Sequence, residues 1–174
     1  MHEQIVCLKK KRMISIVYLF IPGFVSPSGE HMKYVFVYFS RYGNGKRLVE
    51  YLGEKLSKKN GTVQLFKVNE VDPGKVPAAD VYVFSAAAEA FSLQRDMKTF
   101  LKNLSGMEGK KYGIINTHGM KKHRLDNMEK ILSKKNMVKL AEVEFQVQGA
   151  GVQSGNGLPN GWEACLDEFA GKLG

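Results

Sequence analysis

The chain has 174 residues, of which 44% are hydrophobic and 25% charged, and this fits one globular domain with a sizeable core. Its two cysteines, Cys7 and Cys165, are far apart and form no CxxC or Cys/His pattern, which argues against a disulfide framework or a zinc site and fits a reducing cytoplasm. The formal net charge of +9 favours acidic or phosphate-bearing partners, although charge alone gives only non-specific affinity for nucleic acid.

Residues 1–31 differ from the rest of the chain. A basic run, Lys9–Arg12, precedes an apolar run, Met13–Val25, which is similar to a secretory signal and too short to span a bilayer. Met32 then stands directly before the first predicted strand, as a natural start would. The segment is therefore a dispensable upstream extension, a membrane-associating segment or a signal. We expect the functional domain to comprise residues 32–174, without a stable membrane span.

The next stretch predicts a strand, a glycine-rich turn and a helix. Tyr34–Phe39 is a run of β-branched and aromatic residues, typical of a strand buried on both faces. Ser40–Lys46 follows with two glycines and an asparagine, and helical spacing of apolar residues then predicts a helix over Asn44–Lys58. The start of such a helix can bind an anion, because its first N–H groups lack partners. An ordinary strand-to-helix turn that needs glycine explains the residues equally well.

The remaining elements follow in alternation. Asn60-Gly61 predicts the end of the first helix, and Asn160 with Glu163 has the spacing of a capping box at the start of the last one. Ser85–Ser92 and Gly149–Gly157 are predicted connections. Apolar patterns predict strands at Thr62–Val68, Val81–Phe84, Tyr112–Thr117 and Val138–Val147, and helices at about Leu93–Leu104, Leu125–Leu132 and Asn160–Leu173.

Strands that alternate with helices predict an α/β fold: a doubly wound, five-stranded parallel sheet with helices on both faces. Only the helix between the second and third strands is missing or very short. Ligands of such sheets bind beyond the carboxyl ends of the strands, where the strand order reverses. We therefore expect Ser40–Lys46, Ser85–Phe91 and Asn116–His118 to lie along one edge of the sheet.

Over about residues 33–173 the chain resembles the flavodoxin family of the short-chain type. The family turn S-x-T-G-N-T, which wraps the phosphate of FMN, is matched by Ser40, Gly43 and Asn44, and Arg41 is common there. Tyr42 and Gly45 depart from it, because they replace two threonines whose hydroxyls donate to the phosphate. Arg41 and Lys46 can offset that loss, since charged donors make stronger hydrogen bonds.

The resemblance implies FMN as the cofactor and a binding site made of three segments. Phe91 packs on the flavin ring or in the core, Glu89 stands where the family has a ring-stacking tyrosine, and His118 contacts the ring or is merely solvated. The expected cofactor-binding residues are Ser40, Arg41, Tyr42, Gly43, Asn44, Gly45, Lys46, Ala86, Ala87, Ala88, Glu89, Phe91, Asn116, Thr117, His118 and Gly119.

The resemblance further implies electron transfer by a cytoplasmic flavoprotein, with no catalytic side chain and no metal ligand. Residues 1–31 carry +2 of the formal charge, which leaves +7 for the domain, so we expect an acidic redox partner. No helix-turn-helix or aromatic–basic pattern indicates specific nucleic-acid binding. Two alternatives stay open: a small flavin-dependent NAD(P)H or quinone oxidoreductase, and a flavin-free module that binds a phosphate or a protein. Whether the chain is an enzyme is likewise open.

Overall fold

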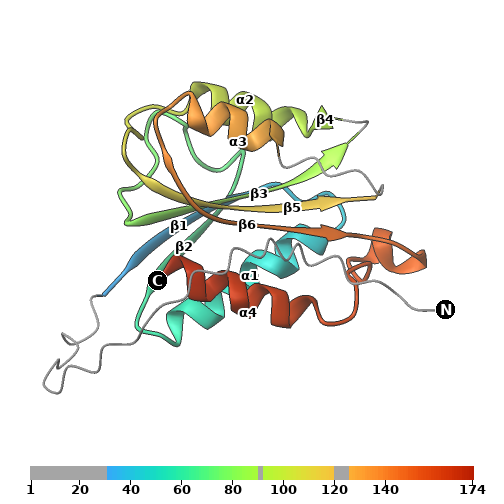
Figure 1. Cartoon of the computed structure of the whole chain (residues 1–174). Coiled ribbons are helices and arrows are strands. Elements are labelled where there is room, and N and C mark those ends of the chain that lie inside the picture. Colours follow the sequence, from blue (N-terminus) through green and yellow to red (C-terminus); the bar gives the residue numbers. More distant parts are fainter. Residues whose placement is uncertain (1–30, 90–91, 120–125) are drawn as a thin grey trace, which may run out of the picture.

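The computed structural model describes residues 31–89, 92–119 and 126–174, and in these residues five parallel strands form one sheet in the order β2-β1-β3-β5-β6. Helices α1 and α4 cover one face of the sheet, and α2 and α3 cover the other (Figure 1). The flavodoxin-like α/β fold predicted from the sequence is thereby confirmed. The strands are β1 Lys33–Tyr38, β2 Thr62–Lys67, β3 Val81–Glu89, β4 Ser92–Leu93, β5 Lys111–His118 and β6 Val138–Gln146; the helices are α1 Asn44–Ser57, α2 Arg95–Asn103, α3 Asp126–Ser133, α4 Trp162–Leu173 and a 3₁₀ turn η1 at Ala150–Ser154.

The apolar runs predicted as strands form the middle of the sheet. In β1, Phe36 packs under α1 and α4 while Val37 packs under α2 and α3, and both side chains are fully buried. A strand between two helical layers has no solvent face, so every position from Tyr34 to Tyr38 is apolar and buried, and only the first residue, Lys33, is exposed. The edge strand β2 instead has no buried residue: Val63 and Phe66 are half-buried and the other four are exposed, which agrees with the half-exposed edge strand that the sequence predicts.

The strand order reverses between β1 and β3. The chain passes from β1 through α1 to β2 on one side, and then crosses back to β3 on the other side of β1. The two strands run parallel with Tyr38 opposite Ser85, and the Phe39 N–H donates to the Ser85 carbonyl at 2.8 Å. The carboxyl ends of β1 and β3 therefore form the edge at which open α/β sheets bind ligands.

Three local predictions are wrong. The Ala-rich segment is no loop: β3 continues to Glu89 and pairs with β5 as far as Ala87, because alanine fits a pleat between two strands, and then pairs with the short antiparallel β4. Leu93 consequently belongs to β4 and not to a helix. The capping box is absent, since α4 begins after Gly161, whose φ is 77° and which makes no side-chain cap. The Asn60-Gly61 stop is confirmed, with Asn60 in the left-handed region at φ 64°.

Candidate functional site

The turn between β1 and α1, residues 40–46, presents the start of a helix at the carboxyl end of β1. The Gly43 N–H donates to Ser40 Oγ at 3.1 Å, and Gly43 has φ 92°, a conformation that favours glycine. Gly43 is the N-cap of α1, makes no side-chain cap hydrogen bond, and the first turn holds no acidic residue. The partial positive charge of α1 is therefore left for an anion.

Basic side chains surround this β1–α1 turn. Arg41, Lys46 and Arg47 are all exposed. Lys46 Nζ lies 3.4 Å from Glu50 Oε1 in a pair that is half exposed on both sides, so this pair contributes little to stability. Arg47 is held more firmly: its guanidinium lies 5.2 Å above the Trp162 ring and donates to Asn156 Oδ1 at 3.2 Å. The sequence analysis did not single out Arg47, and only its place beside Lys46 pointed to it.

Asn44 does not present its side chain to the open side of the turn. It is 5% exposed, its Nδ2 donates to the Val152 carbonyl at 2.8 Å, and its Oδ1 accepts from the Gly157 N–H at 2.9 Å. Both partners belong to the loop of residues 149–157, which follows β6 and includes η1. The amide that the family resemblance implies as part of the cofactor site is thus engaged within the protein.

Tyr42 and Gly45, the two departures from the family turn, have different surroundings. Tyr42 is 45% exposed. Gly45 is buried, and a Cβ at this position would lie 3.2 Å from the Phe39 carbonyl oxygen and 3.5 Å from the Ser40 side chain. The backbone here is thus packed tightly around glycine. Beneath the turn, burial raises the pKa of the Tyr38 hydroxyl above its usual value of 10.0, and the charge of nearby Lys46 opposes that shift.

The second and third predicted segments meet at the carboxyl end of the sheet. Ala86 lies opposite Asn116 and Ala87 opposite Thr117 in the β3–β5 register. Ala87 and Ala88 are half-buried, whereas Ala86, Asn116, Thr117 and His118 are buried and Gly119 is exposed. Phe91 lies outside the described residues, as do Lys121–Arg124. Of Glu89, the structure describes only the position at the end of β3.

One interpretation of the sequence was that His118 is merely solvated, and the structure contradicts it. His118 ends β5 with 7% of its surface exposed, and its Nε2 lies 3.8 Å from Glu144 Oε2. Glu144 comes from β6 and lies opposite Asn116 in the register. Glu144 was not among the residues predicted from the sequence, where it is only one residue of a predicted strand. The structure instead places an acid, an amide and an imidazole together at this end of the sheet.

Two buried polar atoms at the same edge bear on whether FMN fits. Ser85 Oγ and Asn116 Nδ2 have no hydrogen-bond partner within the described part of the chain. Ser85 is the residue whose carbonyl accepts from Phe39, next to the β1–α1 turn, and Asn116 lies near the end of β5. Such buried groups usually have partners, and a polar ligand at the strand ends can supply them. The uncapped helix, the cations and these two atoms fit a phosphate-bearing flavin.

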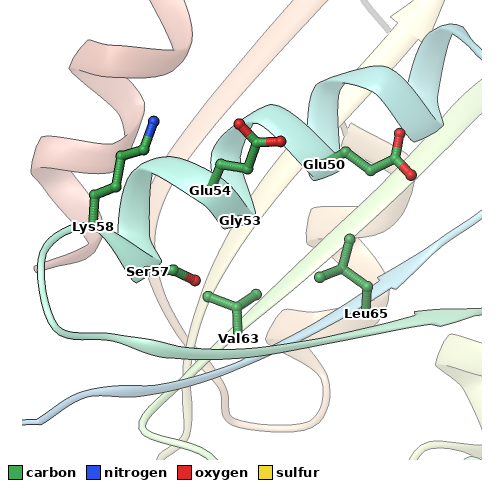
Figure 2. A pocket seen from close by; sticks show the side chains of 7 residues that line it. All are labelled: Glu50, Gly53, Glu54, Ser57, Lys58, Val63 and Leu65. Atoms are coloured by element: carbon green, nitrogen blue, oxygen red, sulfur yellow. The ribbon is translucent and has the colours of Figure 1, made fainter.

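A hollow of the surface lies away from the predicted site. A groove of about 900 Å³ runs between α1 and β2, and Figure 2 shows Val63 and Leu65 reaching from β2 toward α1 near Gly53. No residue that the sequence predicted for the site lines it. Its lining residues are Glu50, Gly53, Glu54, Ser57, Lys58, Val63 and Leu65.

Within 31–89, 92–119 and 126–174, no three acidic, histidine or cysteine side chains gather closely enough to hold a metal ion. Over the same residues, no helix is both long and apolar enough to cross a membrane.

Fold and site together define a flavodoxin-like α/β protein with an open helix start at the strand reversal. No protein-family model matches the sequence, and no curated protein matches it either. Solved structures do match. A flavodoxin from Streptococcus pneumoniae TIGR4 has 18% identity and a TM-score of 0.68 over 81% of this chain and 97% of its own. An archaeal flavodoxin has 18% identity and a TM-score of 0.62 over 82% and 99%.

A larger protein contains the same fold. Rubredoxin:oxygen oxidoreductase from Desulfovibrio gigas matches with 14% identity and a TM-score of 0.68, over 81% of this chain but only 35% of its own length. At these identities the matches establish the flavodoxin-like fold of the chain.

Proposed function

We propose that this protein binds FMN and passes electrons to and from an acidic partner protein. The observation that carries the proposal is the start of α1, which is uncapped, free of acidic residues and surrounded by exposed cations at the strand reversal. The solved structures named above support it, because flavodoxins are among those that share the fold. FMN, when bound, supplies one- and two-electron chemistry.

The protein's own residues orient the cofactor. The first backbone N–H groups of α1 and the side chain of Lys46 bind the phosphate, and the Ser40 hydroxyl, which already accepts from Gly43, still has its proton to donate. At the ring end of the cofactor, Asn116 would donate through its Nδ2 to the polar edge of the flavin ring. The exposed cations around the turn would also attract an acidic partner protein.

A visible spectrum tests the proposal. We expect the purified protein to show flavin absorption bands as isolated, or after incubation with FMN and removal of unbound ligand. A protein that stays colourless after incubation would overturn FMN binding and favour the flavin-free alternative. If the bands appear, NAD(P)H oxidation without a partner protein distinguishes the two flavin functions: electron transfer predicts negligible turnover, and a reductase predicts sustained turnover.

A further inference from the structure

The loop of residues 149–157 packs directly on the β1–α1 turn. The Asn44 side chain is the link: it donates to the Val152 carbonyl at 2.8 Å and accepts from the Gly157 N–H at 2.9 Å. With both hydrogen bonds made, the amide bridges the two arms of the loop. In Figure 1, η1 lies at the carboxyl-end side of the sheet, where this contact is made.

Glycine faces glycine across this contact. A Cβ at Gly155 would lie 3.0 Å from the Tyr42 carbonyl oxygen, and a Cβ at Gly43 would lie 3.6 Å from the Gly155 Cα. Both residues have positive φ, at 79° and 92°. The two backbones therefore approach each other closely, and a Cβ at Gly155 would force the loop or the turn to shift by a few tenths of an ångström.

Arg47 extends the contact to α4. Its Nη1 donates to Asn156 Oδ1 at 3.2 Å, and its guanidinium lies over the Trp162 ring in the first turn of α4. Loop 149–157 is consequently joined to the start of α1 by a buried amide, by close backbone packing and by an arginine.

We propose that loop 149–157 is the outer wall of the phosphate site, and that Asn44 and Gly155 are positioning residues that hold the β1–α1 turn in its binding conformation. This inference rests on the proposed function and deepens it. Asn44 then acts through the loop and does not bind the phosphate itself. By thermodynamic linkage, a phosphate bound at the turn also tightens the loop by the same factor.

Gly155→Ala tests the role of the loop, with Gly149→Ala as its matched control. Gly149 has a similar φ of 78° but a ψ of −178° instead of 9°, so alanine is strained there too, and more strongly, whereas a Cβ meets no heavy atom within 4 Å. The control therefore adds backbone strain to the same loop without the contact to the turn. Titrations of both variants with FMN and with riboflavin, which lacks the phosphate, separate phosphate binding from ring binding.

We expect Gly155→Ala to weaken FMN binding about tenfold and to leave riboflavin binding unchanged, while Gly149→Ala changes neither. A tenfold change corresponds to about 1.4 kcal/mol, the scale of one or two net hydrogen bonds. Equal losses for the two ligands, or equal effects of the two variants, would overturn the proposal, because strain or destabilisation alone would then explain the result.

Asn44→Ala tests, without any flavin, the link that the Asn44 side chain makes between the turn and the loop. Amide hydrogen exchange at Gly157 should become faster in this variant, because the N–H loses its acceptor. Inorganic phosphate should slow exchange at Gly157 in the unmodified protein and not in Asn44→Ala. If phosphate protects Gly157 equally in both, Asn44 does not couple the turn to the loop and the inference fails. This measurement stands even if the protein binds no FMN, so the failure of the two proposals can be distinguished.

Discussion

Replacing Gly53 by alanine should stabilise the protein, since the structure has room for the added methyl group. Gly53 is an interior residue of α1 beside the groove to β2, and its would-be Cβ lies 3.4 Å from Leu65 Cδ1, 3.5 Å from Val63 Cγ1 and 4.0 Å from Phe36 Cε2. These are ordinary van der Waals distances, so no neighbour has to move.

Two contributions set the size of the expected stabilisation. Alanine in place of glycine in a helix interior stabilises by about 0.5–1 kcal/mol. Burial of a methyl group adds up to about 0.8 kcal/mol, and about half of that remains because the groove is open on one side. We expect Gly53→Ala to raise the free energy of unfolding by about 1–1.5 kcal/mol, which for a domain of this size raises Tm by about 3–5 °C.

Thermal unfolding followed by circular dichroism, with urea unfolding at constant m-value, measures the effect. Gly171→Ala in α4 is the matched control, because a Cβ there meets no heavy atom within 4 Å and only the helix preference changes. Gly53→Ala should therefore exceed the control. A Tm below that of the unmodified protein would refute the reasoning and show that the groove needs the space above Gly53.

Three further changes have defined outcomes. Gly113→Ala should destabilise by about 1–3 kcal/mol in urea unfolding, since its Cβ would lie 2.7 Å from Phe169 Cζ in a close-packed core. Asp167→Asn should reduce the acid dependence of stability. The hydrogen bond from Lys55 lowers the pKa of Asp167 in the folded state, so the ionised carboxylate stabilises the fold above its ordinary pKa of 3.8. This contribution disappears as the pH falls through the folded-state pKa. Lys46→Glu should weaken FMN binding about tenfold in a fluorescence titration, because it reverses a charge beside the helix start.

Each of these has a contradicting result. Gly109→Ala adds only the strain of a positive φ of 70°, because a Cβ there meets no heavy atom within 4 Å, so it should cost less than Gly113→Ala. The reverse order would argue against overpacking. A stability difference between Asp167→Asn and the unmodified protein that persists unchanged to pH 2 would exclude the pairing with Lys55. Lys59→Glu, beyond the opposite end of α1, should leave FMN affinity unaltered, and an equal loss would point to net charge instead of a local contact.

The sequence predicted the fold well where a residue's role depends on near neighbours. The unbroken apolar runs of β1 and β3 can only be buried on both faces, and Asn60-Gly61 ends a helix by its own backbone preference. The continuation of β3 through Ala86–Glu89 was missed because alanine favours helices and is depleted in strands, whereas pairing with β5 and β4 decides the conformation here.

The candidate site was predicted only in part, again because the sequence signals what depends on near neighbours and not what depends on distant partners. The position of the β1–α1 turn followed from its glycines and the helix start. The hydrogen bonds of Asn44 could not be predicted from the sequence, since their partners lie more than a hundred residues away in a loop without a distinctive pattern. The neighbourhood of His118 and Glu144 depends on the β5–β6 register, which shifts at a bulge between Tyr112 and Gly113 that the sequence does not signal.

The separation between Asn44 and loop 149–157 has a consequence for the order of assembly. The first helix and the turn before it leave the ribosome well before the loop that packs on them, because Val152 and Gly157 lie 108 and 113 residues after Asn44. A chain that ends after β6 would contain every residue of the β1–α1 turn and still lack the hydrogen-bond partners of Asn44. If loop 149–157 is the outer wall of the phosphate site, as proposed above, a chain that stops before residue 149 would not retain the ligand.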